Sequence, residues 1–330
     1  MKNKQTAANL ILLLVAAIWG GGFIAGKMAL TGLSPAAIIA YRYGMGALMC
    51  GIIFWKRVAK TSKDVMKKGI LIGALQAAGQ AVQLIGLQYT SSANQSFLCS
   101  AYVAFVPFIS WVMIGKRPKI KSFVAGATAL AGIGFISLKE SFTIGIGDSL
   151  SVLFAVIFGI QIVLIGKLVD KDSDIAGLTF FQMLTAALAG FAVCIVQGGL
   201  TLDIGKEAIV GVVYLGVLNT FVAFMAQNYA QKYAKDTTAA LIMSMESLFG
   251  FLLSVLYYRE VITVKFLAGS ALCFAAVLMN TIEKGRKADD IIFQRDRKQP
   301  PCGHESGSND RRGRRGRYGK HDKERGAQKF

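Results

Sequence analysis

The amino-acid sequence predicts an all-α integral membrane protein with ten transmembrane helices, arranged as two inverted repeats of five helices each. Three observations predict it: the composition, the long uncharged runs and a weak internal repeat. Of the 330 residues, 54% are hydrophobic and only 17% are charged, whereas soluble domains carry roughly 25% charged residues. Such a chain has too little polar surface to cover its cores in water, so an ordinary soluble enzyme is excluded.

The predicted spans follow from where charge is missing. Gly69 to Gly115 contains no charged residue, and neither does Ile175 to Leu202. A helix needs about 20 apolar residues to cross the hydrocarbon core of a bilayer. The first run is therefore two spans, divided by the polar patch at residues 88–94. Ten spans result, at residues 7–29, 35–55, 69–89, 93–114, 122–138, 147–168, 175–197, 208–231, 237–258 and 264–282. Within the fourth of them, Pro107 predicts a kink.

The loops between the spans predict the orientation. With the N-terminus inside, the inside loops carry 16 Lys and Arg residues and the outside loops carry 5, as the positive-inside rule requires. The loop at 56–68 and the loop at 116–121 account for most of the difference. Ten spans return the C-terminus to the same side. We therefore expect a multi-pass protein of the cell membrane with both termini in the cytoplasm.

Comparison of the chain with itself reveals a weak repeat. An offset of 144 pairs Gln83 with Gln227, Ser100 with Ser244 and Tyr102 with Glu246. Offsets near 140 align the earlier spans of the first half with the second half of the chain. Each span then lies opposite the fifth span after it. Five is an odd number, so the second repeat enters the membrane in the opposite orientation. Inverted repeats are typical of secondary transporters, whose substrate site lies near the midplane between the repeats.

Two ionisable residues within the spans are candidates for that site, because an ionisable group in hydrocarbon normally faces a cavity or a partner. Glu246 lies near the middle of the ninth span, with nine uncharged residues before it and twelve after it. It binds either a substrate ammonium group or a proton, or else it is a structural partner for a neighbouring helix. Arg42 in the second span is a second candidate, with a structural ion pair or snorkelling to the interface as the alternatives.

Uncharged polar residues extend the candidate pathway. Gln76, Gln80 and Gln83 follow the spacing i, i+4, i+7, so they share one face of the third span. An amide that faces lipid leaves its hydrogen-bonding groups unsatisfied. This face therefore lines a hydrated cavity or forms hydrogen bonds between helices. Further interior polarity comes from Gln161, Gln182, Asn219 and Gln227. Such walls suit a polar organic solute rather than the ring of carboxylates of a cation channel.

At several of these positions the chain resembles the EamA family of the drug/metabolite transporter superfamily. The resemblance rests on Trp19-Gly-Gly-Gly-Phe23 with Lys27, Tyr41-Arg42, Tyr102 to Pro107 before Lys116-Arg-Pro118, Glu246 to Phe249, Arg259-Glu260 and Phe266 to Gly269. It implies a ten-helix inverted-repeat fold with a central cavity, and export of amino acids, other metabolites or toxic compounds. By position, it also implies that Trp19, Arg42, Tyr102 and Glu246 lie at or near the pathway. Ser247 departs from the family, which often has proline there.

The predicted organisation is a first repeat at residues 7–140, a second at 145–283 and a basic cytoplasmic tail at 284–330. The tail contains little apolar material, so we expect it to be disordered. Its densest basic run, Arg311 to Arg317, is compatible with weak contact with anionic lipid. A dedicated nucleic-acid partner is not expected.

The predicted function is therefore a secondary transporter that exports small polar solutes, with the lipid bilayer as its surroundings. The chain has no Gly-x-x-x-x-Gly-Lys-Ser/Thr motif for ATP. No catalytic residue, cofactor or metal is expected, since both histidines lie in the tail and four of the five cysteines fall inside spans, where they pack as small apolar residues. The alternatives are a membrane-embedded transferase and a channel or scaffold. The expected pathway residues are Trp19, Arg42, Gln76, Gln80, Gln83, Tyr102, Gln161, Gln182, Gln227 and Glu246.

Overall fold

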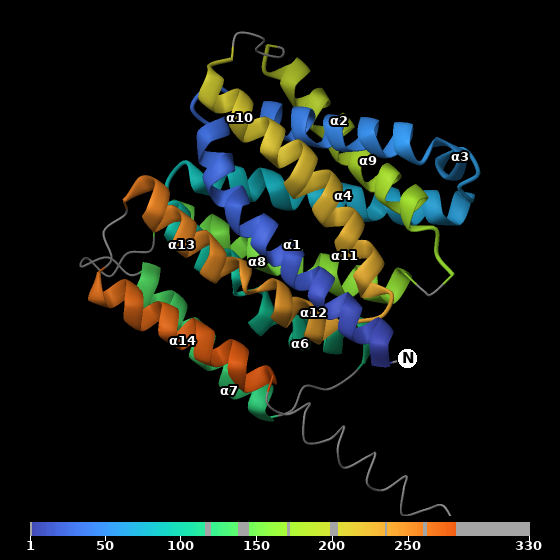
Figure 1. Ribbon diagram of the computed structural model, residues 1–330. Coiled ribbons are helices and arrows are strands. Elements are labelled where there is room, and N and C mark those ends of the chain that lie inside the picture. Colours follow the sequence, from blue (N-terminus) through green and yellow to red (C-terminus); the bar gives the residue numbers. More distant parts are fainter. Residues whose placement is uncertain are drawn as a thin grey trace, which may run out of the picture. The chain divides into compact units, whose positions relative to one another are not determined.

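The computed structural model describes residues 2–115, 120–137, 145–169, 172–198, 204–234, 236–259 and 263–281, and all of its regular structure is helical. These residues belong to one compact unit that spans residues 1–285 (Figure 1). The predicted tail at 284–330 and most of the basic loop at 116–121 lie outside the described residues, and so do the last residues of both predicted repeats.

The helices follow the predicted spans closely. The first repeat region contains α1 (Lys2–Ala29), α2 (Pro35–Ile53), α3 (Trp55–Val58), α4 (Lys63–Leu87), α5 (Ser92–Ser100), α6 (Tyr102–Ile114) and α7 (Ile120–Ser137). The second contains α8 (Ile146–Leu168), α9 (Ile175–Val196), α10 (Lys206–Tyr214), the π-helix η1 (Leu215–Val222), α11 (Ala223–Gln231), α12 (Asp236–Met243), α13 (Glu246–Tyr258) and α14 (Val264–Thr281).

Eight segments of the described chain are long and apolar enough to cross a membrane. They are α1, α2, α4, α5 with α6, α8, α9, the run from α10 through η1 to α11, and α12 with α13. The helices α7 and α14 occupy the positions of the fifth and tenth predicted spans. The chain is thus a multi-pass membrane protein, in contact with the lipid bilayer.

Short polar sequences set the ends of the spans. The Ser34 side chain accepts a hydrogen bond from the Ala37 amide at the start of α2, and Ser91 does the same for Asn94 at the start of α5, as N-cap residues do. Helix α4 begins at Lys63, six residues before the predicted third span. This extra turn and a half is amphipathic, with a Lys68–Asp64 ion pair of 2.7 Å, so charge patterning alone placed the helix start too late.

The fourth and ninth spans are each broken near the middle, which the sequence analysis did not predict. Helix α5 ends at Ser100 and α6 begins at Tyr102, while α12 ends at Met243 and α13 begins at Glu246. The two breaks coincide under the 144-residue offset of the repeat. Pro107, where a kink was predicted, lies inside α6, six residues after the break. Discontinuous helices at corresponding positions of two repeats are typical of transporter binding sites.

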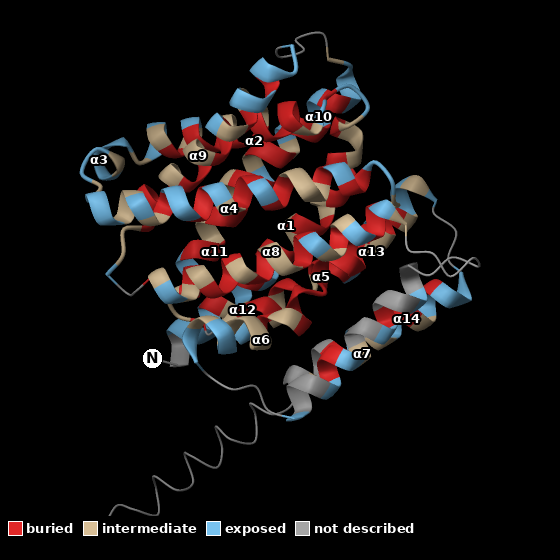
Figure 2. Ribbon diagram, turned by 180° about the vertical axis from the view of Figure 1, so that it is seen from behind, coloured by how far each residue is buried: buried red, intermediate tan, exposed pale blue. Residues whose placement is uncertain are grey.

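Three helix pairs join corresponding spans of the two repeat regions. Helix α2 packs along α9, α5 crosses α13, and α7 packs along α14. Helix α1 lies against α10, α11, α12 and α13 (Figure 1). Buried residues concentrate where these helices meet, and exposed ones lie on the outer surfaces (Figure 2). Many of those exposed side chains are large and apolar, as a lipid-facing surface requires: Leu10, Leu48, Ile52, Val112, Ile195, Val196 and Leu256.

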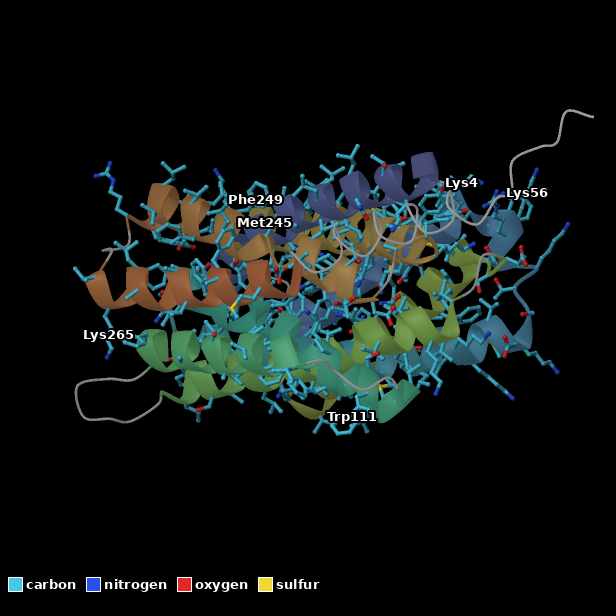
Figure 3. The ribbon with its side chains drawn as sticks, turned by 90° about the horizontal axis from the view of Figure 1, so that it is seen from below. Lys4, Lys56, Trp111, Met245, Phe249 and Lys265 are labelled. Atoms are coloured by element: carbon cyan, nitrogen blue, oxygen red, sulfur yellow. The ribbon has the colours of Figure 1, made fainter. Side chains whose placement is uncertain are left out.

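One end of the bundle carries the basic segment at residues 56–63. Lys4 and Lys56 lie at one end, here named the basic end, and Lys265 lies at the opposite end (Figure 3). The Lys4 ammonium lies 5.8 Å from the centre of the Tyr233 ring, so the chain that follows α11 is also at the basic end. At the opposite end, Lys27 lies 5.4 Å from the Tyr258 ring, as a snorkelling lysine can.

Glycines allow the closest helix crossings. An added methyl group at Gly20 of α1 would lie 2.5 Å from Cβ of Phe249 on α13. The glycine triplet 20–22 lies within the continuous helix α1, and Gly20 allows α13 to approach α1 closely. At Gly190 of α9, a methyl group would lie 2.6 Å from the Ala40 backbone nitrogen of α2, which cannot move aside without displacing the helix.

Substitution of Gly190 by alanine is therefore expected to separate α2 from α9 and to lower the free energy of unfolding by about 1–3 kcal/mol. The matched control is G44A, on the other helix of the same pair, where a methyl group would meet only the Phe191 ring at 3.5 Å. Thermal unfolding of the purified proteins in mild detergent measures both. Equal melting temperatures for G190A and the wild type would contradict the tight crossing.

Candidate functional site

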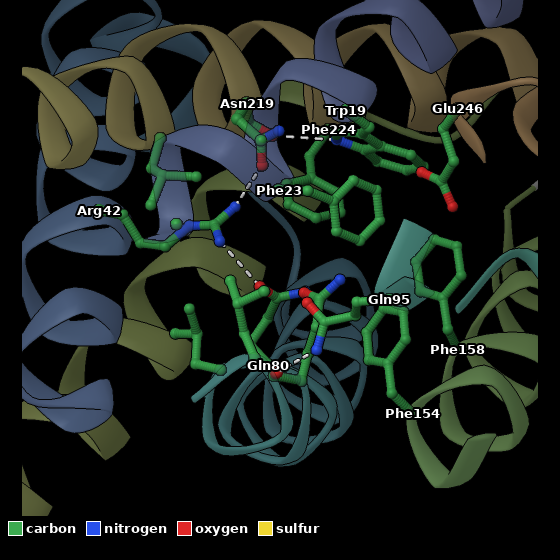
Figure 4. Close-up of a pocket in the computed structure, with 16 residues that line it drawn as sticks. Trp19, Phe23, Arg42, Gln80, Gln95, Phe154, Phe158, Asn219, Phe224 and Glu246 are labelled. Atoms are coloured by element: carbon green, nitrogen blue, oxygen red, sulfur yellow. Dashed lines mark hydrogen bonds between the residues drawn. The ribbon is translucent and has the colours of Figure 1, made fainter. Parts of the chain in front are cut away.

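A small cavity lies at the centre of the bundle, where the broken helices meet α1, α2, α4 and α8 (Figure 4). It has about 40 Å³ of free volume, which is room for a few water molecules. Its lining comes from both repeat regions: Trp19, Gly22, Phe23, Gly26, Arg42, Gln80, Gln83, Leu84, Leu87, Gln95, Phe154, Phe158, Leu215, Asn219, Phe224 and Glu246.

Arg42 is the charged centre of one side of the cavity. Its side chain is 3% exposed and donates three hydrogen bonds: from Nε to Thr220 Oγ1 at 2.8 Å, from Nη1 to Gln80 Oε1 at 2.8 Å and from Nη2 to Asn219 Oδ1 at 2.6 Å. All three acceptors are uncharged. Within the described chain, no carboxylate lies within 4 Å of the guanidinium. The ion pair and the snorkelling geometry considered from the sequence are therefore not what this arginine adopts.

The π-helix η1 supplies two of these acceptors and also fixes Trp19. Trp19 Nε1 donates to the Asn219 backbone oxygen at 3.1 Å, and the Asn219 amide donates to the Ile18 oxygen at 3.3 Å. Both bonds join residues about 200 positions apart in the chain. π-Helical segments often occur at functional sites. Here the segment links α1 of the first repeat region to Arg42 through one residue.

Glu246 lies across the cavity from Arg42, at the start of α13 (Figure 4). Its side chain is 4% exposed, and Oε1 accepts a hydrogen bond of 3.4 Å from the Ser100 hydroxyl at the end of α5. The Tyr102 hydroxyl lies close to the same carboxyl group but makes no hydrogen bond with another described residue. The two helix breaks therefore bring Ser100, Tyr102 and Glu246 together. A carboxylate in the first turn of a helix is stabilised by the helix dipole.

Aromatic rings form the wall between Arg42 and Glu246. The Trp19 ring lies 5.4 Å from Phe158 and 5.4 Å from Phe224. Phe154 stacks on Phe158 at 5.5 Å, and Tyr102 meets Phe158 edge-on at 5.0 Å. The cavity therefore presents a guanidinium, a carboxyl group and an apolar surface to any solute that fills it.

The predicted pathway residues divide into two groups. Trp19, Arg42, Gln80, Gln83 and Glu246 line the cavity, with Tyr102 packed against its wall. The other four, Gln76, Gln161, Gln182 and Gln227, lie outside its lining. Gln76 accepts hydrogen bonds from Gln161 and Gln182, and Gln182 accepts one from Asn228 at 2.8 Å. Gln227 is fully buried.

Several cavity residues were not singled out from the sequence. Gln95 lines the cavity, and Thr220 accepts the hydrogen bond from Arg42 Nε; both are uncharged polar residues inside predicted spans, the same signal that indicated Gln161 and Gln182. The aromatic residues Phe154, Phe158 and Phe224 gave no signal, because phenylalanine is common on every face of a transmembrane helix.

Comparison with known proteins identifies the family. A sequence profile described as the EamA-like transporter family matches residues 6–138 and 145–282. The chain belongs to the EamA-like transporter family. The resemblance inferred from the motifs is thereby confirmed, as is a two-repeat architecture.

Similar proteins extend this result. A protein of Archaeoglobus fulgidus named as an uncharacterized transporter is 34% identical over 84% of this chain and 86% of its own length. The uncharacterized transporter YoaV of Bacillus subtilis is 22% identical, over 83% of this chain and 96% of its own. A solved crystal structure with 17% identity superposes with a TM-score of 0.65 over 85% of this chain and 98% of that one, which shows a shared fold. This EamA protein is therefore a membrane transporter.

The Arg42 geometry generates a prediction about stability. Q80L removes the acceptor of Nη1 and leaves a buried donor unpaired, so we expect it to lower the free energy of unfolding by about 1–3 kcal/mol. Q83L is the matched control, since Gln83 lies on the same helix and lines the same cavity but donates only to the Cys99 sulfur at 3.8 Å. Thermal unfolding in detergent compares the two, and a larger loss in Q83L would be inconsistent with this role for Gln80.

Proposed function

We propose that this EamA protein is a secondary transporter that exports small polar metabolites or amino acids, or related toxic compounds, from the cytoplasm by alternating access. The observation that carries the proposal is the buried guanidinium of Arg42, which has only uncharged partners and shares one cavity with Glu246. A buried cation without a counter-ion is costly, and a solute carboxylate supplies the missing negative charge.

A zwitterion fits this arrangement. Its carboxylate would pair with Arg42 through charge-assisted hydrogen bonds. Its ammonium group would meet Glu246, and its carbon skeleton would lie against the Trp19 and Phe158 rings. In the solute-free phase, the same carboxyl group would carry a proton instead, so that proton entry drives solute exit.

Alternating access is supported by the small size of the cavity. Ligand sites in proteins typically have about 300–1,000 Å³, so the 40 Å³ present here requires rearrangement before a metabolite fits. The coincident breaks after Ser100 and Met243 provide two points at which the halves can bend. Movement at these breaks would enlarge the cavity toward one membrane face at a time.

We further propose ten spans, with α7 and α14 as the fifth and tenth, and two repeats of opposite orientation. Pairing of α2 with α9 and of α7 with α14 supports this arrangement. The lysines at the basic end favour placing that end, and hence both termini, in the cytoplasm. The plasma membrane is the proposed location.

Metabolite profiles of cells and medium, with the protein produced or deleted, would reveal the exported solute. The purified protein in liposomes should then show saturable counterflow of that solute. Conductance without counterflow would indicate a channel, and chemical conversion of the solute would indicate an enzyme; either result would refute the proposal.

The charge of Arg42 can be neutralised internally to test its role. N219D places a carboxylate where Oδ1 of Asn219 now lies 2.6 Å from the guanidinium, so it competes with the solute carboxylate. We expect at least a tenfold loss of counterflow, equivalent to about 1.4 kcal/mol, with the melting temperature retained. N219S is the control, because it changes the same side chain without adding charge. Full transport by N219D would rule out Arg42 as the carboxylate site.

Glu246 is tested by its response to a pH gradient. E246Q should lose accumulation driven by the gradient, because the amide cannot exchange a proton. Counterflow in liposomes should persist at reduced affinity, because the amide oxygen still accepts a hydrogen bond from the solute ammonium group. D148N is the matched control: Asp148 is also a buried carboxylate but bonds to Thr90 at 2.7 Å, away from the cavity. A pH-gradient response in E246Q equal to that of the wild type would eliminate the coupling role.

A further inference from the structure

A second polar cluster lies between the central cavity and the basic end of the bundle. It joins α4, α8, α9 and α11 through amide side chains, and we name it the inner amide cluster: Gln76, Gln161, Thr179, Gln182, Gln227, Asn228 and Gln231. Its position follows from the helix ends. Gln161 and Gln182 each lie about two turns from the end of α8 or the start of α9. Both of those termini are at the basic end, since Thr61, after α3, contacts Asp174 at 3.5 Å.

The cluster continues the wall of the central cavity. Phe224 lines the cavity, and Gln227, Asn228 and Gln231 follow it on α11 at i+3, i+4 and i+7, on the same helix face. Tyr43 connects the two regions from α2. Its ring lies 6.2 Å from that of Phe224, and its hydroxyl lies close to Gln76.

Part of the cluster is satisfied and part is not. Asn228 Nδ2 donates to Thr179 at 2.9 Å and to Gln182 at 2.8 Å. Both amide atoms of Gln227 lack a hydrogen-bond partner among the described residues, and so do Asn228 Oδ1, Gln231 Oε1 and the Tyr43 hydroxyl. Gln227 and Asn228 are completely buried, and Gln231 is nearly so.

Such an arrangement is costly for a purely structural cluster. A buried polar atom left without a partner destabilises the folded protein, and the hydrogen bonds already formed would be enough to associate the helices. The unpaired atoms include a donor, three acceptors and a hydroxyl, and all of them are uncharged. They are complementary to a ligand with hydrogen-bond donors and acceptors of its own.

We propose that the inner amide cluster is a second solute site, at which the transported solute binds on the cytoplasmic side before it reaches Arg42 and Glu246. The proposal rests on the export function proposed above. The ligand is a small polar organic solute of the amino-acid class, held by Gln227, Asn228 and Gln231 through uncharged hydrogen bonds. The bonds of Gln76 with Gln161 and Gln182 close the path from this site to the central cavity. When these amides give up their hydrogen bonds to one another and bind the solute or water instead, the path opens.

Thiol labelling tests the proposal. The five native cysteines are replaced by alanine, counterflow is verified, and Gln227→Cys is introduced. The membrane-impermeant reagent MTSET is then applied to either face of the protein in oriented vesicles. We expect Gln227→Cys to react faster from the face at the basic end. An equimolar mixture of neutral L-amino acids is added at a total concentration of twice its apparent dissociation constant. It should slow the reaction about threefold.

Three further single-cysteine variants make the result decisive. Gln231→Cys is a second reporter of the cluster, should Gln227→Cys fold poorly. Gln83→Cys reports the central cavity, and Ser254→Cys, at another buried hydroxyl without a partner, should not be protected by the mixture.

Protection of Gln83→Cys without protection of either cluster reporter would overturn the second site while leaving the proposed function intact. Absence of protection at all three cavity and cluster reporters would refute the amino-acid class, and the inner site with it. Equal labelling of Gln227→Cys from both faces would contradict its place on the cytoplasmic side.

Discussion

Burial of one guanidinium without a counter-ion is the constraint on which the centre of this molecule depends. An arginine in the middle of a bilayer costs roughly 3 kcal/mol or more, and Arg42 offsets this cost with three uncharged oxygens. Those oxygens come from α4 and from η1, which are far apart in the chain. The hydrogen bonds of Arg42 therefore join the two repeat regions at the cavity. None of the three oxygens carries the negative charge that would balance the guanidinium.

On the other side of the cavity, the two helix breaks position the groups around Glu246. They bring Ser100, Tyr102 and Glu246 together, so a carboxyl group and the hydroxyl that donates to it come from corresponding breaks in the two repeat regions. The repeat thus produces an asymmetric site from similar backbones. Tyr102 and Glu246 occupy equivalent positions, but one is a phenol and the other a carboxyl group.

The sequence predicted the helices well because the requirement that sets them is local. Each span must be apolar for about 20 residues, and a single charge or polar patch reveals its end. The breaks at Ser100 and Met243 escaped prediction since neither contains glycine or proline. Arg42 and Glu246 were recognisable because ionisable residues are rare in hydrocarbon. Their partners were not, because the Arg42–Asn219 bond spans 177 positions. Helical spacing placed Gln76, Gln80 and Gln83 on one face, but it could not reveal that Gln76 meets amides while Gln80 meets a cation.

The indole of Trp19, held by the backbone of the π-helix, gives the protein an internal optical reporter. The chain has three tryptophans. Trp19 is 7% exposed, whereas Trp55 and Trp111 are 61% and 40% exposed on the outer surface. Their fluorescence senses the surroundings of the bundle, and that of Trp19 senses the cavity. If the cavity widens as proposed, water that enters would shift the Trp19 emission to longer wavelength, so its opening could be followed without any added dye.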